Sequence, residues 1–310
     1  MDKVYQRKNL EMAWEMVKAN RGSGGVDGQS PEGFAAQLDQ QLDRLQSELK
    51  EDVYRPGYPC LWGPVRRVSI PKAGKPGEFG TLGIPTIYDR VCRQALLNRL
   101  EPIFEPVFDE ANFGYRRGRS TKDAMRKVWK EIQGGRKWIV DADPKDFFGS
   151  VDHAKLLSLV TRRIADGRVL RLIEAMFKAG SYGKGRLFPS ERGTPQGGVV
   201  SPLLSNILLT PFDQEMRRKG YQLTRYADDW VVTCESAAEA RRWPRRFAGA
   251  LWADERTGCA IASAEDADRA CPARIRVSWV QDQARTKAAT VASGQDPQWC
   301  SVGGAVRLPP

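Results

Sequence analysis

The most informative stretch of the chain is Leu223-Thr-Arg-Tyr-Ala-Asp-Asp-Trp-Val-Val232. Apolar residues at a spacing of two on each side predict two strands, and the Ala227-Asp228-Asp229 step predicts the tight turn that joins them. Adjacent carboxylates repel each other, so a fold normally separates them or supplies a cation. A hairpin tip that carries both into a cleft offers the oxygen ligands that Mg²⁺ prefers. The alternative is a solvated turn, because Asp is common in turns.

The composition favours an anionic partner. The chain has 310 residues, with 49 Lys and Arg against 38 Asp and Glu, and a formal net charge of +11. Such an excess of positive charge is typical of nucleic-acid binding, although solubility alone would also explain it. Six scattered cysteines and the single His153 give no zinc pattern and exclude a mechanism that needs two imidazoles. The sequence shows no N-terminal signal and no apolar run of about 18 residues, so we expect a soluble, cytoplasmic protein with no membrane partner.

Two amphipathic patterns predict helices near the N-terminus. The first is carried by Leu10, Ala13, Trp14 and Val17, and the second by a longer set. The members of that second set are Phe34, Leu38, Leu42, Leu45 and Leu49. Between them, the glycine-rich residues 22–28 form either a linker or, as we favour, a loop that faces a substrate. Residues 1–50 are therefore expected to form an N-terminal helical part.

The next segment alternates between turns and basic residues. Residues 54–86 are rich in Pro, Gly and basic groups, with a hairpin expected around Val65–Pro71 and a helix from Ile87 to Leu100. The sequence Phe113-Gly-Tyr-Arg-Arg-Gly-Arg-Ser120 then leads into a helix capped by Ser120 or Thr121. Three arginines precede this helix N-terminus, which favours an anion site, the alternative being a solvated basic loop. They are Arg116, Arg117 and Arg119.

A second pair of acids ends a buried strand. Residues 138–143 predict a strand in which Asp141 and Asp143 share one face. Helices are expected at 156–160 and 169–177. The loop Gly193-Thr-Pro-Gln-Gly-Gly198, where glycines let the backbone approach a ligand closely, precedes a helix from about Ser201 to Lys219. An ordinary connecting turn is the other interpretation of that loop.

Taken in order, these segments resemble a reverse transcriptase of the bacterial group II intron type. The resemblance covers about residues 8 to 240 and rests on five segments in the family's order and spacing. They are Leu82–Thr86 with Asp89-Arg90, Phe113–Ser120, Asp141–His153, Gly193–Gly198 and Tyr226–Asp229. It implies an α+β fold of the polymerase right-hand type, in which fingers precede a palm of antiparallel strands backed by helices. On this basis residues 51–242 form the fingers and palm.

The resemblance also implies the chemistry and the residues that perform it. Addition of a nucleotide is an in-line phosphoryl transfer supported by two Mg²⁺ ions roughly 3.5–4 Å apart. Asp143 and Asp228 are the implied main metal ligands, with Asp229 in support. The nucleotide and primer residues implied are Lys72, Phe148, Gln196 and Tyr226. Phe148 matches the residue that excludes a ribose 2′-hydroxyl, whereas Phe147 is expected in the core. The implied partners are an RNA template, a DNA primer or cDNA, deoxynucleoside triphosphates and intron RNA.

Some positions depart from the family pattern. Gly80 stands where relatives carry an arginine, which removes a fork-shaped phosphate donor that lysine does not replace well. Asp146 and Gly149 exchange the usual Gly and Asp. Pro144 replaces an aliphatic residue but keeps the backbone carbonyl.

The end of the chain does not continue the resemblance. Residues 243–310 show no sustained helical or strand period, and the expected lysine segment, primer-grip turn and thumb are absent as written. Back-translation of Glu265–Ala284, read one nucleotide later, allows KTRIVHVRHGFEFLGYKIKR, which contains the missing segment and a Phe-Leu-Gly turn. We therefore expect a frameshift between about residues 240 and 262 and a poorly folded tail. A divergent native tail is the alternative.

Three hypotheses about the function follow from these residues and this resemblance. The first is an RNA-directed DNA polymerase of the intron type, impaired because its thumb and primer grip are missing. The second is a non-catalytic RNA-binding remnant, and the third a retron-type or defence-type reverse transcriptase. Binding of RNA that survives loss of the aspartates would select the second, and genomic surroundings would separate the first from the third.

Overall fold

The computed structural model describes residues 1–56, 65–71, 77, 79–144, 147–183, 186–188, 193, 198–240 and 273–279. Its longer helices are α2 (Arg7–Ala19), α4 (Leu38–Lys50), α5 (Ile87–Phe104), α6 (Thr121–Gln133), α8 (His153–Thr161), α9 (Gly167–Lys178) and α10 (Ser201–Arg218). The short ones are α1 (Asp2–Tyr5), α3 (Pro31–Ala35), η1 (Glu105–Val107) and α7 (Phe147–Ser150). The strands are β1 (Val65–Pro71), β2 (Phe79–Ile84), β3 (Trp138–Pro144), β4 (Ser181–Gly183), β5 (Arg186–Phe188), β6 (Gln222–Tyr226), β7 (Asp229–Cys234) and β8 (Ala273–Trp279).

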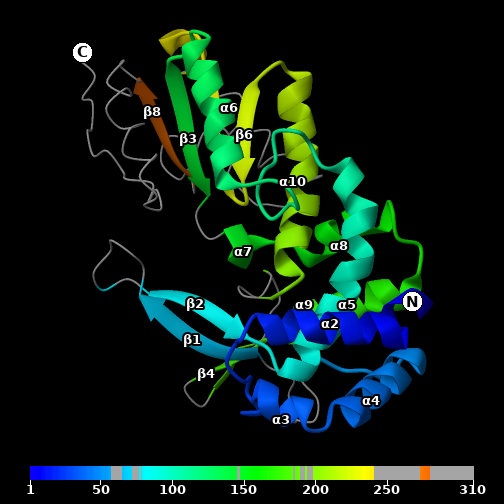
Figure 1. Ribbon diagram of the computed structural model, residues 1–310. Coiled ribbons are helices and arrows are strands. Elements are labelled where there is room, and N and C mark those ends of the chain that lie inside the picture. Colours follow the sequence, from blue (N-terminus) through cyan, green and yellow to red (C-terminus); the bar gives the residue numbers. More distant parts are fainter. Residues whose placement is uncertain are drawn as a thin grey trace.

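Two four-stranded sheets lie at different ends of the molecule (Figure 1). The first, with strand order β2-β1-β4-β5, lies beside the N-terminal helices; we call it the fingers sheet. The second, with order β6-β7-β3-β8, is antiparallel at every pairing and is called the palm sheet. The α+β class and the antiparallel palm sheet are as the sequence predicted.

The helices form most of the apolar core. The predicted apolar face of α2 is buried: Leu10 and Ala13 are fully covered, and Trp14 stacks on Phe34 with ring centroids 4.9 Å apart. This core continues through α5, α8 and α9 into the first half of α10, where Leu208 is buried. Burial of each such side chain contributes about 1.5–3 kcal/mol relative to exposure.

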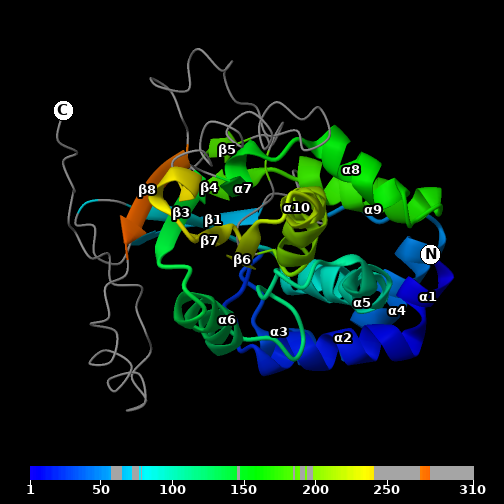
Figure 2. The same cartoon turned by 90° about the horizontal axis from the view of Figure 1, so that it is seen from above.

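The palm sheet has helices on both faces (Figure 2). Val140 of β3 and Val232 of β7 are opposite each other, fully buried, and share a core with Phe212 and Met216 of α10. On the other face, Lys127 of α6 donates from Nζ to the Leu223 carbonyl at 2.7 Å and to Thr224 Oγ1 at 3.0 Å. The sheet is thus fixed from both sides by its own chain.

Some predicted elements differ from those observed. The pattern from Phe34 to Leu49 is split between α3 and α4, because Gln37 leaves the helical conformation. Helix α5 runs past the predicted end at Leu100 to Phe104, with Pro102 inside its last turn. Ser120, rather than Thr121, caps α6.

The C-terminal segment also contains an element that the sequence did not predict. Strand β8 pairs with β3 along its whole length, from Trp138 opposite Trp279 to Pro144 opposite Ala273. Residues 243–310 showed no strand period in the sequence, and the structure nevertheless places residues 273–279 as a strand on this edge of β3. A backbone edge accepts a strand of almost any sequence, because main-chain groups make the ladder. The proposed frameshift and the thumb fall on residues that lie mostly outside the described part.

No helix within the described residues is long and apolar enough to cross a membrane.

Candidate active site

The two aspartates lie at the tip of the β6–β7 hairpin. Tyr226 pairs with Asp229, which leaves Ala227 and Asp228 as a two-residue turn. Ala227 has a φ of 59°, so its backbone adopts the left-handed conformation that such tight turns require. Asp228 is half-buried, whereas Asp229 opens β7 and is exposed. The predicted turn is therefore confirmed, with its second aspartate already in the strand.

Strand β3 brings its acidic end to the same tip. Ala142 is opposite Trp230, so Asp143 and Asp229 are the next residues on two paired antiparallel strands. Opposite residues of such a pair project to the same face of the sheet. Asp141 lies two residues further from the tip than Asp143, opposite Val231. The side chain of Asp143 lies outside the described residues. The backbone register nevertheless favours Asp143 over Asp141 as the partner of the hairpin.

Residues 111–115 pack tightly against the turn. A Cβ added at Gly114 would lie 2.1 Å from Ala227 N, so only glycine fits there. The next residue, Tyr115, places its ring 6.2 Å from that of Tyr226. Burial raises the pKa of the Tyr115 hydroxyl, and the carboxylates of Asp228 and Asp229 raise it further. The contact of this segment with the turn had no local signal in the sequence, because the two segments are separated by more than a hundred residues.

The arginines before α6 have different surroundings. Arg116 is buried; it pairs with Glu105 at 2.7 Å and donates to the carbonyls of Asp109 and Asn112. Arg119 donates to Glu110 and to two backbone carbonyls, and its guanidinium lies over the Phe113 ring. Arg117 keeps 73% of its side chain exposed beside Glu101. The expected phosphate contact does not fit Arg116, because its donors already have partners inside the protein.

The capping signal at the same place is confirmed. Ser120 accepts from the backbone N–H of Asp123, and the Asp123 carboxylate accepts from the backbone N–H of Ser120 at 3.0 Å. This reciprocal pair is a capping box. The helix N-terminus is thus occupied by its own carboxylate.

Two of the remaining predicted residues, Phe148 and Tyr226, lie within the described part of the chain. Phe148 of α7 is half-buried and meets the buried Phe147 edge-on, with centroids 5.4 Å apart. A Cβ at Gly193 would lie 2.8 Å from the Phe148 carbonyl, so the start of the glycine-rich loop packs against α7. Tyr226 is half-buried and pairs with Asp229 across the hairpin. Lys72 and Gln196 lie outside the described residues.

The donor set at the tip suits a hard cation. Carboxylate oxygens from two strands are the ligands that Mg²⁺ accepts, and the chain offers no competing cluster of His and Cys there. Within the part of the chain whose side chains are described, no group of three His, Cys, Asp or Glu side chains forms a metal site. The third ligand of the expected set, Asp143, falls outside that part.

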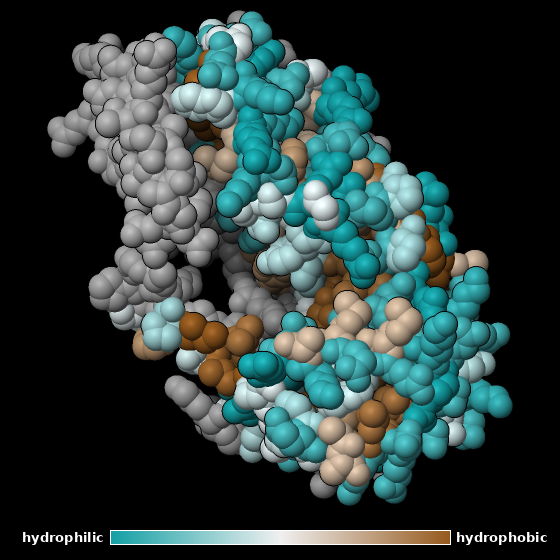
Figure 3. Space-filling model, in the orientation of Figure 1, coloured by the Kyte–Doolittle hydropathy of each residue, from teal (hydrophilic) through white to brown (hydrophobic). Residues whose placement is uncertain are grey.

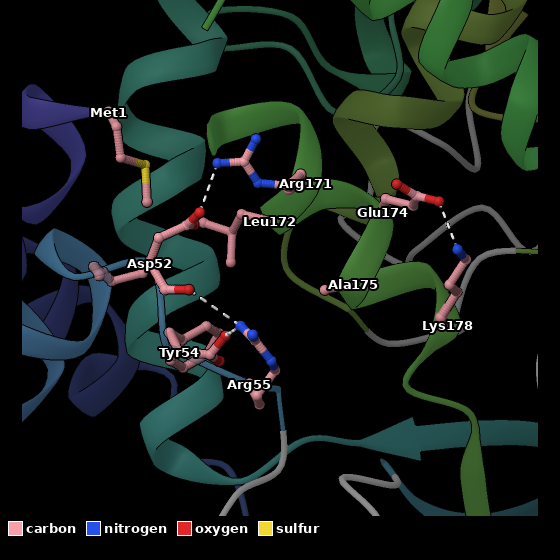
Figure 4. Close-up of a pocket in the computed structure, with 10 residues that line it drawn as sticks. Met1, Asp52, Tyr54, Arg55, Arg171, Leu172, Glu174, Ala175 and Lys178 are labelled. Carbon is pink, nitrogen blue, oxygen red and sulfur yellow. Dashed lines mark hydrogen bonds and ion pairs between the residues drawn. The ribbon is translucent and has the colours of Figure 1, made fainter. Parts of the chain in front are cut away.

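A cavity of about 260 Å³ lies elsewhere, between the end of α4 and α9 (Figure 4). Its charged walls are largely neutralised: Arg171 pairs with Asp52 at 2.6 Å, and Lys178 pairs with Glu174 at 2.6 Å. The residues that line it include none from β3, β6 or β7. The cavity is therefore not part of the aspartate site.

Comparison with known proteins agrees with this architecture. The family described as reverse transcriptase (RNA-dependent DNA polymerase) matches residues 70–251, which contain β3, the hairpin and the glycine-rich loop. The chain belongs to the reverse transcriptase family. The match begins within β1 of the fingers sheet and ends shortly after the hairpin, close to where the motifs of the sequence end.

Individual relatives place the chain near intron proteins. It is 36% identical over 233 residues to Protein YkfC of Escherichia coli K12, covering 73% of this chain and 59% of that one. It is 33% identical over 205 residues to group II intron-encoded protein LtrA of Lactococcus lactis subsp. cremoris, covering 66% of this chain and 32% of that one. A 91 kDa protein in a cob intron of Schizosaccharomyces pombe is 32% identical over 215 residues, covering 69% and 25%.

Among solved structures, a partial Cas6-RT-Cas1–Cas2 complex is similar at 19% identity and a TM-score of 0.48, covering 80% of this chain and 41% of that one. The chain spans 59% of the length of the first relative and about a third or less of the other two.

Proposed function

We propose that this chain provides the fingers and palm of an RNA-directed DNA polymerase of the group II intron type. The observation that carries the proposal is the meeting of two acidic strand ends at one tip. Asp228 and Asp229 lie at the tip of the β6–β7 hairpin, and the neighbouring strand β3 reaches the same tip at Asp143. Converging carboxylates from separate elements are what a site for two ions requires.

Asp143 and Asp228 are the proposed main ligands of two Mg²⁺ ions, and Asp229 supports them. Bound there, the ions would activate a primer 3′-hydroxyl and stabilise the leaving oxygen of the triphosphate. Side chains of the protein would position the nucleotide and the primer. Phe148, supported by Phe147, would bound the sugar pocket of a deoxynucleoside triphosphate, and Tyr226 would pack near the primer end.

The nucleic-acid contacts are proposed to follow the remaining basic surface. Arg117 is exposed beside α6 and is free of the internal carbonyl contacts that hold Arg116 and Arg119. Lys72 and Gln196 keep their proposed roles at the triphosphate and the template. An RNA template, a DNA primer and, for an intron enzyme, the intron RNA are the proposed partners.

We further propose that synthesis by this polypeptide is impaired. The family match ends at residue 251 and the similarity to Protein YkfC covers 73% of the chain, which supports a change of sequence character near residue 240. Without a primer grip and thumb in the ordinary frame, the duplex is not held in register with the carboxylates. A misplacement of about 1 Å costs on the order of 10²-fold in rate.

Primer extension with Mg²⁺ tests the proposal, with an Asp228→Ala chain as the control. We expect slow incorporation of one or a few nucleotides, abolished in the control. Salt-sensitive RNA binding without any incorporation, unchanged in Asp228→Ala, would instead select the RNA-binding remnant. Robust, processive synthesis that depends on Asp228 would contradict the impairment.

The frameshift has its own test, which is the gene sequence. We expect the codons of residues 265–284, read one nucleotide later, to encode KTRIVHVRHGFEFLGYKIKR and to continue to a thumb. Codons that do not give this string would rule the frameshift out and leave a divergent tail. Intron RNA boundaries around the gene would favour the intron type over a retron type.

A further inference from the structure

Arg225 is a charged residue at a core-facing position of β6. It shares the parity of Leu223, and its side chain is fully buried. Asp213 of α10, which is 1% exposed, accepts from Arg225 Nε at 2.8 Å and from Nη2 at 2.5 Å. A buried charge is costly unless it is paired and hydrogen-bonded. Burial raises the pKa of the Asp213 carboxyl, and the Arg225 charge opposes that rise.

The rest of the guanidinium points at the turn that carries the aspartates. Arg225 Nη1 donates to the Ala227 carbonyl at 2.7 Å and to Asn206 Oδ1 at 3.0 Å. The Ala227 carbonyl belongs to the peptide whose N–H is that of Asp228. Since Ala227 has a φ of 59°, a conformation that costs about 1–2 kcal/mol for a residue other than glycine, a hydrogen bond to this peptide helps to hold it in place.

Asn206 extends the network to the segment that packs on the turn. Its Nδ2 donates to the Gly114 carbonyl at 2.9 Å, and Gly114 is in direct contact with Ala227. The backbone of Arg225 also bonds this segment, accepting from Phe113 N and donating to the Ala111 carbonyl, each at 2.8 Å. One arginine thus joins α10, residues 111–114 and the turn.

We propose that Arg225 is a positioning residue for the carboxylates of the hairpin: by fixing the peptide between Ala227 and Asp228, it sets where Asp228 and Asp229 can meet a metal ion. This inference rests on the proposed function. Arginine suits the role because its planar fork serves Asp213, Asn206 and Ala227 at once, whereas lysine has a single ammonium centre. The positioning acts through the turn and requires no contact between Arg225 and a substrate.

The test compares Arg225→Lys and Asn206→Leu in the full chain with the unchanged protein. Mn²⁺ binding is measured by electron paramagnetic resonance, and backbone hydrogen exchange is measured at residues 227–230. We expect Mn²⁺ affinity to fall on the order of tenfold, as for other residues that orient ligands, and turn exchange to accelerate by a similar factor. Asn206→Leu keeps the pair of Arg225 and Asp213, so it carries the test if Arg225→Lys does not fold.

Asn9→Ala is the matched control. Asn9 is buried in the helical core and donates to the carbonyls of Val4 and Ala95, far along the fold from the turn. It should lower the melting temperature while leaving Mn²⁺ affinity and turn exchange unchanged. Variants at Arg225 and Asn206 that behave like Asn9→Ala would overturn the positioning role.

The same measurements distinguish a wrong metal site from a wrong role of Arg225. If the unchanged protein and Asp228→Ala both bind no Mn²⁺, the metal site itself is wrong, and hydrogen exchange at the turn still decides whether Arg225 fixes it. If the unchanged protein binds Mn²⁺ through Asp228 and the Arg225 variants bind equally well with unchanged exchange, only the positioning role is wrong.

Discussion

The palm sheet and the fingers sheet differ in what covers them. In the palm sheet, Val140 and Val232 are completely buried against α10, and Arg225 is sealed below the hairpin tip. In the fingers sheet, Ile70, Phe79, Tyr182 and Phe188 are 38–61% exposed. Figure 3 shows apolar residues at the surface where β1 and β2 lie in Figure 1. The difference is between a sheet whose apolar side chains are packed under a helix and a sheet whose apolar side chains are partly exposed.

Removing one aromatic ring that packs on the palm sheet and one from the fingers sheet should lower stability by very different amounts, and this is the largest expected effect. Phe212→Ala empties a buried site that packs on Trp230 at 5.2 Å between centroids. We expect a loss of about 3–5 kcal/mol in the free energy of unfolding. Phe79→Ala, at 61% exposure, should change it by about 0.5 kcal/mol or less. Urea unfolding measures both, and equal losses would remove the distinction between the sheets.

A single methyl group added at Gly114 should disrupt the β6–β7 turn at Ala227. The added Cβ meets backbone atoms of Ala227 that cannot move without moving the turn. We expect Gly114→Ala to destabilise by about 1–3 kcal/mol, as in other overpacked sites, and to abolish the Asp228-dependent incorporation. Gly134→Ala is the control, because its new Cβ would lie no closer than 3.4 Å to any neighbour. Thermal unfolding with single-nucleotide incorporation checks both, and a tolerant Gly114 would contradict the packing.

A smaller effect is expected at the start of α6, the helix that contacts the palm sheet through Lys127. Ser120→Ala should cost about 1 kcal/mol by loss of the cap. Hydrogen bonds from Ser120 hold the pKa of the Asp123 carboxyl below its ordinary value of 3.8. A carboxyl group whose pKa is lower in the folded state stabilises the fold at pH values above its ordinary pKa. That stabilisation is lost as the pH falls through the lowered pKa. The stability difference between Ser120→Ala and the unchanged chain should therefore shrink below about pH 4; a constant difference would contradict the reciprocal cap.

The smallest effect is expected at the exposed arginine. Arg117→Gln should weaken RNA binding a few-fold and lower the slope of log affinity against log salt by about one. Unfolding should change by less than about 1 kcal/mol, since an exposed ion pair with Glu101 contributes little. Arg116→Gln should instead destabilise the fold, because it leaves buried partners of the guanidinium unpaired. Filter binding over a salt series, with unfolding in parallel, would reveal whether the two arginines are in fact equivalent.

The sequence predicted the elements that have a local signal. The hairpin turn, the strand at residues 138–143, the Ser120 cap and the buried face of α2 follow from residues near one another in the chain, and the structure confirms each. The order of the motifs also identified the family correctly. These features depend on backbone preferences and periodicity, which short stretches encode.

What the sequence did not predict depends on contacts between distant segments. Arg116 and Arg117 are adjacent and chemically identical, yet Arg116 is buried against Glu105 and Arg117 is exposed. The network of Arg225 was missed for the same reason, although a signal existed. A charge at a core-facing position of a strand predicts a buried partner, and Asp213 on the buried face of α10 was available to be that partner.

The central claim is that the acidic ends of β3 and the hairpin form one metal site. Titration of Mn²⁺ into the unchanged chain, Asp228→Asn and Asp143→Asn, followed by electron paramagnetic resonance, tests this most directly. We expect the unchanged chain to bind Mn²⁺ and either substitution alone to remove most of this binding, with the fold intact by circular dichroism. Unchanged binding in Asp143→Asn, beside loss in Asp228→Asn, would show that β3 takes no part and would contradict the claim.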